Sequence, residues 1–222
     1  MQSQRYHQAL GATAACTVRL SEEMAQSELT CGLKGDSWFG SVKSCNELSL
    51  RGKVGVFVVK TSTSLYPKKF IEATLADCPG GCHIVLEGTH PSGQQLIAMG
   101  YRYSTKCTLC FIFNPGTGST RPGAPYEMKY ATDNGNVGVR WVDRPDVISK
   151  YFAGSNAVDK HNHVRQFELG LEKCWITHNP YFRLFTTLLG INVVDCWKLS
   201  SYHGLSRAIK VTNIQRVKMQ YR

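Results

Sequence analysis

The sequence has no apolar run long enough to cross a lipid bilayer. Its longest apolar stretch, 188–197, is interrupted by Asn192 and Asp195, whereas a spanning helix needs about 20 predominantly apolar residues. The N-terminal MQSQRYHQAL also lacks the apolar segment of a secretory signal. We therefore expect no membrane partner, and a nuclear or cytosolic chain whose nine cysteines are reduced thiols.

Acidic residues are scarce. The 222 residues include 16 Asp and Glu against 26 Lys and Arg, which gives a net charge of +10. This balance favours a polyanionic partner. Basic residues gather in two stretches, where they form either phosphate contacts or an ordinary solvated surface: Lys43, Arg51, Lys53, Lys60, Lys68 and Lys69, then Arg140, Arg144, Lys150, Lys160 and Arg165. No helix-turn-helix or zinc-finger pattern accompanies them.

The first 60 residues predict a strand, a helix and a second strand. Residues 11–25 and 41–50 have helical patterns, and 29–35 has the pattern of a short strand. Residues 53–60 form a nearly continuous apolar run, as in strands buried on both faces. The predicted order is typical of a right-handed βαβ unit with parallel strands.

Residues 61–148 predict a β-rich insertion. A short helix over 67–76 precedes strands over 83–87, 95–103 and 107–113, a loop over 114–125, and a hairpin pairing 126–130 with 137–142. Helical periodicity returns after Pro145, with helices at 156–173 and from Asn179-Pro180 to about 200, and residues 149–200 are expected to supply the C-terminal helices of the core. Residues 201–222 predict a basic tail.

Two carboxylates occupy positions suited to divalent cations. Asp36 follows the first predicted strand and Asp159 lies on a predicted helix. Mg²⁺ prefers oxygen ligands and keeps several waters, so few carboxylates are needed. Two such ions can hold the attacking and leaving oxygens of a phosphoryl transfer. The alternative is structural: Asp36 caps the helix that follows it, and Asp159 is an exposed helix residue.

The two aspartate segments resemble motifs of a known family. Gly35-Asp-Ser-Trp-Phe-Gly-Ser41 resembles the second-aspartate motif of piggyBac-type cut-and-paste transposases. Ser149-Lys-Tyr-Phe-Ala-Gly-Ser-Asn-Ala-Val-Asp-Lys-His-Asn162 resembles their third-aspartate motif. The resemblance implies an α/β fold, with a partial ribonuclease-H-like core that holds a β-rich insertion. It also implies Asp36 and Asp159 as catalytic metal ligands for two Mg²⁺ ions.

The resemblance further implies a nuclear protein that acts on DNA at transposon terminal repeats, either alone or as a homodimer. Its ancestral activity is DNA cleavage and strand transfer. Residues 1–35 contain no Asp that could match the family's first catalytic aspartate, so we expect this chain to be inactive. Asn162 stands where some members have a further Asp. The alternative is a domesticated, non-catalytic DNA-binding protein.

A third hypothesis rests on cysteines. Cys78 and Cys82 form one pair, and Cys107 and Cys110 form another. Four thiolates could hold Zn²⁺ and organise an interaction module. The second pair lies in a predicted strand, where positions three apart face opposite sides, and this spacing disfavours joint coordination.

Overall fold

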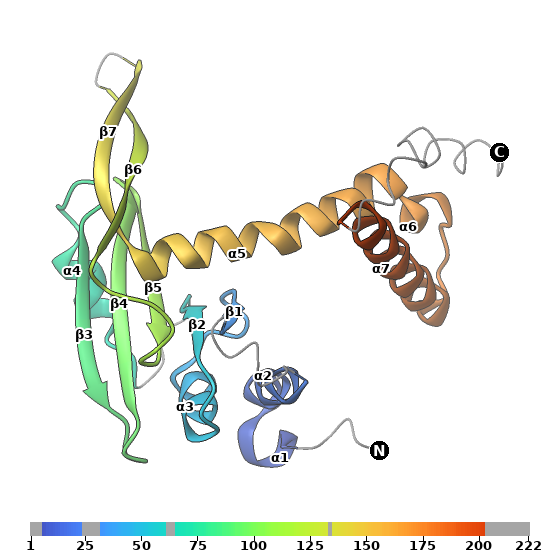
Figure 1. Cartoon of the computed structure of the whole chain (residues 1–222), viewed down its shortest axis with the longest axis horizontal. Coiled ribbons are helices and arrows are strands. Elements are labelled where there is room, and N and C mark those ends of the chain that lie inside the picture. The colour runs from blue at the N-terminus through green and yellow to red at the C-terminus, as the bar shows by residue number, and fades with distance from the viewer. Residues whose placement is uncertain (1–5, 24–31, 61–64, 133–134, 203–222) are drawn as a thin grey trace. The chain divides into compact units, whose positions relative to one another are not determined.

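The chain folds into two compact units, residues 1–155 and 156–222. The computed structural model describes residues 6–23, 32–60, 65–132 and 135–202, and Figure 1 labels its helices and strands. The first unit is mixed α/β and is built around a five-stranded mixed sheet. The second unit is helical.

A parallel pair of strands opens the sheet. β1 (Leu33–Gly35) pairs in parallel with β2 (Gly55–Val58), and α3 (Val42–Leu50) connects them. Ser41 begins α3 as its N-cap, because its Oγ accepts the backbone N–H of Ser44 at 3.0 Å. The predicted βαβ unit is confirmed in these elements. The start of the predicted first strand, before residue 32, lies outside the described residues.

Three further strands extend the same sheet. β3 (His83–Thr89), β4 (Gln95–Ser104) and β5 (Cys107–Phe113) form an antiparallel meander, and β5 pairs antiparallel with β2. The strand order is β1-β2-β5-β4-β3. The predicted β-rich stretch therefore shares its hydrogen-bond ladder with the preceding βαβ unit. Domain boundaries near residues 60 and 148 stay predictions.

The sheet is covered on both faces. One face buries Phe57 and Ile112 against α3 and α4 (Lys68–Thr74). The other buries Val56 and Phe113 against the start of α5 (Asp146–His163). Neighbouring residues of β2 thus enter different cores, which explains its nearly continuous apolar sequence. A cavity of about 170 Å³ opens on the α4 face and is lined mainly by apolar side chains.

A hairpin forms a separate two-stranded sheet (Figure 1), and its Met128 packs into the core beside Met99 and Tyr101 of β4. It pairs β6 (Pro122–Ala131) with β7 (Val137–Pro145) in antiparallel register. The hairpin itself is confirmed. The predicted loop over 114–125 is wrong at its end, because β6 already begins at Pro122, which pairs with Pro145 across a register shift. Residues 133–134 of the predicted turn lie outside the described residues.

The helix after the hairpin begins earlier than predicted. α5 starts at Asp146 directly after β7, not at residue 156. Asp146 suits a first turn because its carboxylate interacts favourably with the helix dipole, and it accepts the N–H of Ser119 at 3.3 Å. The return of helical periodicity after Pro145 agrees with this start, whereas the predicted helix bound of 156 is wrong by ten residues.

The second unit contains the remaining helices. A π-helical turn (Val164–Leu169) ends at Gly170, whose φ of 62° is the left-handed conformation that favours glycine. The predicted helix over 156–173 is thus broken, and α6 (Leu171–Cys174) follows.

The last described helix, α7 (Pro180–Tyr202), agrees with prediction, and the Asn179 side chain accepts the N–H of Tyr181 at 2.9 Å. Residues 203–222 of the predicted tail lie outside the described residues. None of the described helices is long and apolar enough to cross a bilayer.

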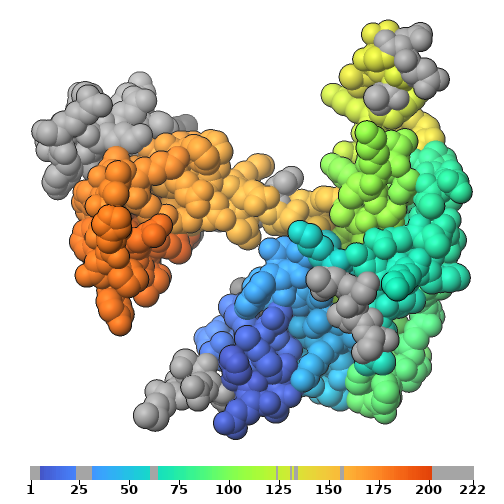
Figure 2. Space-filling model, turned by 180° about the vertical axis from the view of Figure 1, so that it is seen from behind, coloured from blue at the N-terminus to red at the C-terminus, as the bar shows by residue number. Residues whose placement is uncertain are grey.

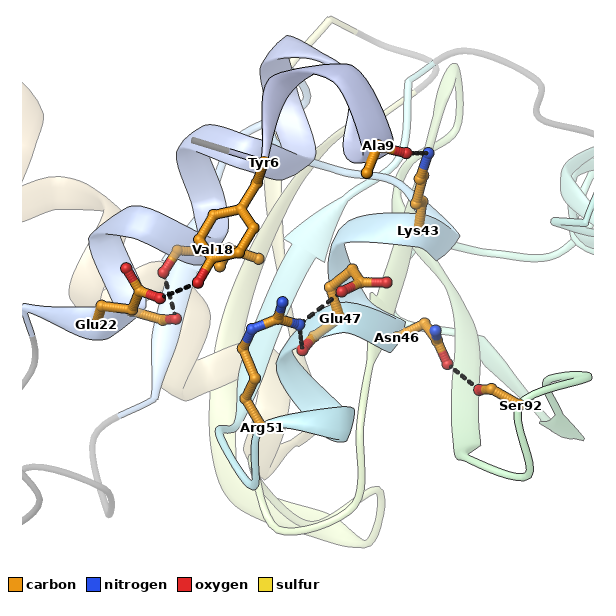
Figure 3. A network of polar contacts seen from close by, with 10 residues as sticks. Tyr6, Ala9, Val18, Glu22, Lys43, Asn46, Glu47, Arg51 and Ser92 are labelled. Atoms are coloured by element: carbon orange, nitrogen blue, oxygen red, sulfur yellow. Dashed lines mark hydrogen bonds and ion pairs between the residues drawn. The ribbon is translucent and has the colours of Figure 1, made fainter. Parts of the chain in front are cut away.

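Two N-terminal helices, α1 (His7–Leu10) and α2 (Ala12–Glu22), lie beside α3. Figure 2 shows this blue segment packed on the lighter blue segment that follows it. Figure 3 shows polar contacts within these elements and between them. Lys43 donates to the carbonyl of Ala9 at 2.9 Å, Tyr6 donates to Glu22 at 2.7 Å, and the Arg51 guanidinium lies 5.4 Å from the centre of the Tyr6 ring. These contacts join the N-terminal helices to the βαβ unit.

Candidate functional site

Asp36 lies at the carboxyl end of β1 and is exposed. Its carboxylate accepts the backbone N–H of Trp38 at 2.9 Å. Its carbonyl accepts the N–H groups of Phe39 and Gly40 at 3.2 and 3.1 Å. Asp36 therefore shapes the turn between β1 and α3, while its side chain stays accessible to solvent. It does not cap α3 itself, because Ser41 does so.

Close packing requires the two glycines of the Asp36 motif, Gly35 and Gly40. A Cβ on Gly35 would lie 2.6 Å from the Phe57 ring, and one on Gly40 would lie 1.7 Å from the carbonyl oxygen of Val58. The turn therefore runs directly against β2. Much of the Gly35–Ser41 motif thus has a structural explanation that is independent of any chemistry at Asp36.

Asp159 lies on α5 and is exposed, and Asn162 is partly buried one turn later. Asp36 belongs to the first compact unit and Asp159 to the second. Their convergence on one metal site stays a prediction. The neighbouring His161 is partly buried, and its Nε2 lies 2.9 Å from the Asp195 carboxylate of α7.

Carboxylates such as Asp36 and Asp159 supply the hard oxygen ligands that Mg²⁺ takes. Among the described residues, no group of three or more His, Cys, Asp and Glu side chains is placed to hold a metal ion. The chemistry of both residues fits Mg²⁺, and the exposure of Asp36 leaves room for a hydrated ion. Magnesium binding by this pair stays a prediction.

The four cysteines of the zinc hypothesis differ in environment. Cys107 is exposed and Cys110 is buried in the sheet core, as alternation along β5 predicts. Burial is the main cause that raises the pKa of Cys110 to about 11. Burial and the neighbouring Cys78 raise the pKa of Cys82. Thiols with raised pKa values are poorer metal ligands, because zinc binds the thiolate.

Several basic residues proposed for phosphate contact have partners within the chain. Arg51 pairs with Glu47 at 2.5 Å (Figure 3), Lys68 with Glu72 at 3.4 Å, and Lys150 with Asp146 at 2.8 Å. Arg144 is buried among aromatic rings. The sequence shows charge but not these partners, so it overstates how much of the charge is available to a ligand.

Lys34 is a cation outside the two basic stretches of the sequence. It lies on β1, two residues before Asp36, and is exposed. Its side chain lies against Gly154 of α5, because a Cβ on that glycine would approach Lys34 Nζ to 2.8 Å. The only sequence signal was its position two residues before Asp36, near the end of the predicted strand over 29–35.

Comparison with known proteins gives a structural likeness. No protein-family model matches the sequence, and no curated protein matches it. The fold resembles that of a piggyBac transposase. The matching chain belongs to a cryo-EM structure of a piggyBac transposase synaptic complex with hairpin DNA. The TM-score is 0.54 and the sequence identity 13%, over 90% of this chain and 36% of that one. The present chain thus spans about a third of the transposase, and the likeness concerns the fold.

Proposed function

We propose that this chain derives from a piggyBac-type transposase and that it binds DNA. The observation that carries the proposal is the fold similarity to the transposase, which extends over 90% of the chain. The two aspartate motifs also support a transposase origin, and the +10 net charge also supports DNA binding. In this proposal, β1, α3, β2 and α5 belong to a partial ribonuclease-H-like core, and the protein works in the nucleus.

The ancestral chemistry would be DNA cleavage followed by strand transfer. Asp36 and Asp159 would hold Mg²⁺ together with a third carboxylate. When bound, two such ions stabilise the charge on the attacking and leaving oxygens of the phosphodiester. Asp36 is supported in this role by its place at the exposed carboxyl end of a parallel strand. The turn that it shapes would hold its carboxylate in a defined orientation.

The 222-residue chain by itself is proposed to bind DNA without cutting it. Residues 1–35 contain no aspartate to serve as the third carboxylate. This absence favours the non-catalytic, DNA-binding version of the proposal. Binding should be mainly electrostatic, because each phosphate neutralised on duplex DNA contributes about −0.9 to the slope of log affinity against log salt.

The test combines DNA binding and cleavage by the purified chain. We expect affinity for duplex DNA that falls steeply with salt, and no cleavage with Mg²⁺. Asp36→Asn keeps a side-chain oxygen for the Trp38 N–H but removes the negative charge. It should therefore bind DNA more tightly than the native chain in EDTA, and Mg²⁺ should reduce this difference.

Asp77→Asn is the matched control, because Asp77 is also exposed and lies after α4, away from the turn that Asp36 shapes. It should leave affinity unchanged. Absence of DNA binding at low salt would overturn the proposal. Mg²⁺-dependent cleavage that Asp36→Asn abolishes would instead support the transposase origin and overturn the expected inactivity.

A further inference from the structure

Lys34 points to the face of the sheet that α5 covers. It pairs with Val56 of β2, and residues that pair across neighbouring strands point to the same face. Val56 lies in the core formed with Val147, Ile148 and Tyr151 of α5. The next residue, Gly35, pairs with Phe57, which lies in the opposite core. The strand alternation therefore fixes the direction of the Lys34 side chain.

The absence of a side chain at Gly154 leaves the space that the Lys34 side chain fills. A Cβ on Gly154 would lie 2.5 Å from Lys34 Cδ and 2.8 Å from Lys34 Nζ, so only glycine leaves this space open. Glycine in a helix interior costs stability relative to alanine, and here the missing side chain is replaced by the lysine stem. The lysine stem and ammonium therefore lie against the helix at Gly154.

Lys34 is exposed and has no acidic partner among the described residues. Some other cations of the first unit are paired, as Arg51 is with Glu47 and Lys150 with Asp146. The charge of Lys34 is therefore available to an external anion. Asp36 follows two residues further along the chain, in the turn at the carboxyl end of β1.

From this arrangement we propose that Lys34 binds a backbone phosphate of DNA beside Asp36. The inference rests on the proposed function, which supplies DNA as the ligand. An ammonium is a compact point charge with three rotatable donors, and it suits phosphate contact better than base recognition. Lys34 is thus a positioning residue that brings a phosphodiester to the carboxyl end of β1, where Asp36 lies.

The experiment measures the salt dependence of DNA binding by the full chain. A fluorescently labelled duplex of fixed sequence is titrated at several salt concentrations, and Lys34→Gln is compared with Lys106→Gln. Lys106 is an exposed lysine in the turn between β4 and β5, and its replacement removes the same charge. Lys34→Gln should reduce the magnitude of the salt slope by about 0.9. If the variant and the native chain bind equally at about 1 M salt, the variant should bind about eightfold more weakly at about 0.1 M salt. Lys106→Gln should leave the slope unchanged.

Gly154→Ala provides a second variant that keeps the net charge. The new methyl group must displace the Lys34 ammonium, which lies at the end of a flexible side chain. DNA binding should weaken as in Lys34→Gln, and the double variant should bind no more weakly than Lys34→Gln alone. Thermal stability should not fall, since alanine favours the helix. A loss of binding would then not reflect unfolding.

Two results would overturn the inference. If the native chain binds DNA but Lys34→Gln and Lys106→Gln have equal salt slopes, the role of Lys34 is wrong and the proposed function stands. If Gly154→Ala binds DNA like the native chain while Lys34→Gln binds DNA more weakly, the proposed position of the Lys34 ammonium against α5 is wrong. Absence of DNA binding by the native chain would overturn this inference and the proposed function together.

Discussion

The side chain of Asn114 accepts the backbone N–H of Gly55 at 2.8 Å, which ties the end of β5 to the start of β2. The same side chain donates to Lys53 O at 2.7 Å and to Ser49 Oγ at 3.0 Å. Asn114 is only 3% exposed. One buried amide therefore fixes the non-local pairing by which the β-rich stretch joins the βαβ unit.

Asn114→Ala should destabilise the first unit by about 2–3 kcal/mol, because it leaves buried backbone and side-chain groups without partners. Denaturant unfolding followed by circular dichroism would measure the change. Asn136→Ala is the matched control at an exposed position after the hairpin turn, and should change stability by less than about 0.5 kcal/mol. Equal effects would show that the amide network contributes little.

Gly40→Ala should destabilise the chain by about 3 kcal/mol or prevent folding, because the new methyl group would overlap the backbone of β2. Gly88→Ala on β3 should be tolerated, since its Cβ would meet no atom within 4 Å. Comparing soluble yield and unfolding midpoints tests this pair. A stable Gly40→Ala chain would mean that the glycine in the Asp36 motif is not required for packing.

Arg144 should couple energetically to Tyr126. Its guanidinium carbon lies 3.1 Å from the centre of the Tyr126 ring, while its Nε is 3.4 Å from the Tyr101 hydroxyl. This buried cation joins the hairpin to the sheet. A double-mutant cycle with Arg144→Met and Tyr126→Leu should give a coupling of about 1–2 kcal/mol, as expected for a desolvated cation–π contact. Additive effects of the two substitutions would contradict the coupling between Arg144 and Tyr126.

Stability should fall in alkaline solution because of two buried thiols. Burial raises the pKa of Cys110 from 9.0 to about 11, and it raises that of Cys45 further. Above pH 9 the unfolded chain loses these protons while the folded chain keeps them. Ionisation therefore favours unfolding, and the free energy of unfolding should decline from about pH 9 to pH 11.

Cys110→Val should make that decline shallower, whereas Cys107→Val, at an exposed position of the same strand, should not. Denaturant unfolding at several pH values would measure both slopes. A Cys110→Val chain with the native pH dependence would show that this thiol does not control alkaline stability.

Local patterns predicted most of the individual elements. The apolar run ending at Val59 is typical of a doubly buried strand, and β2 is one. Asn179-Pro180 predicted the start of α7, and that helix begins there. Helical periodicity returned after Pro145, but the predicted helix began only at 156, whereas the first turn of α5 follows β7 directly. Boundaries set by contacts with other segments are not encoded locally.

By itself, the sequence determined the type of most elements, the charge, and the two candidate carboxylates. Those properties depend on residues that are near each other in the chain. The tertiary structure decided that β5 pairs with β2, that several cations are already paired, and that Lys34 lies against Gly154. Each of these depends on segments that are distant in sequence. Whether a charge is available to a ligand is set by the neighbours that folding brings to it, and no local pattern records them.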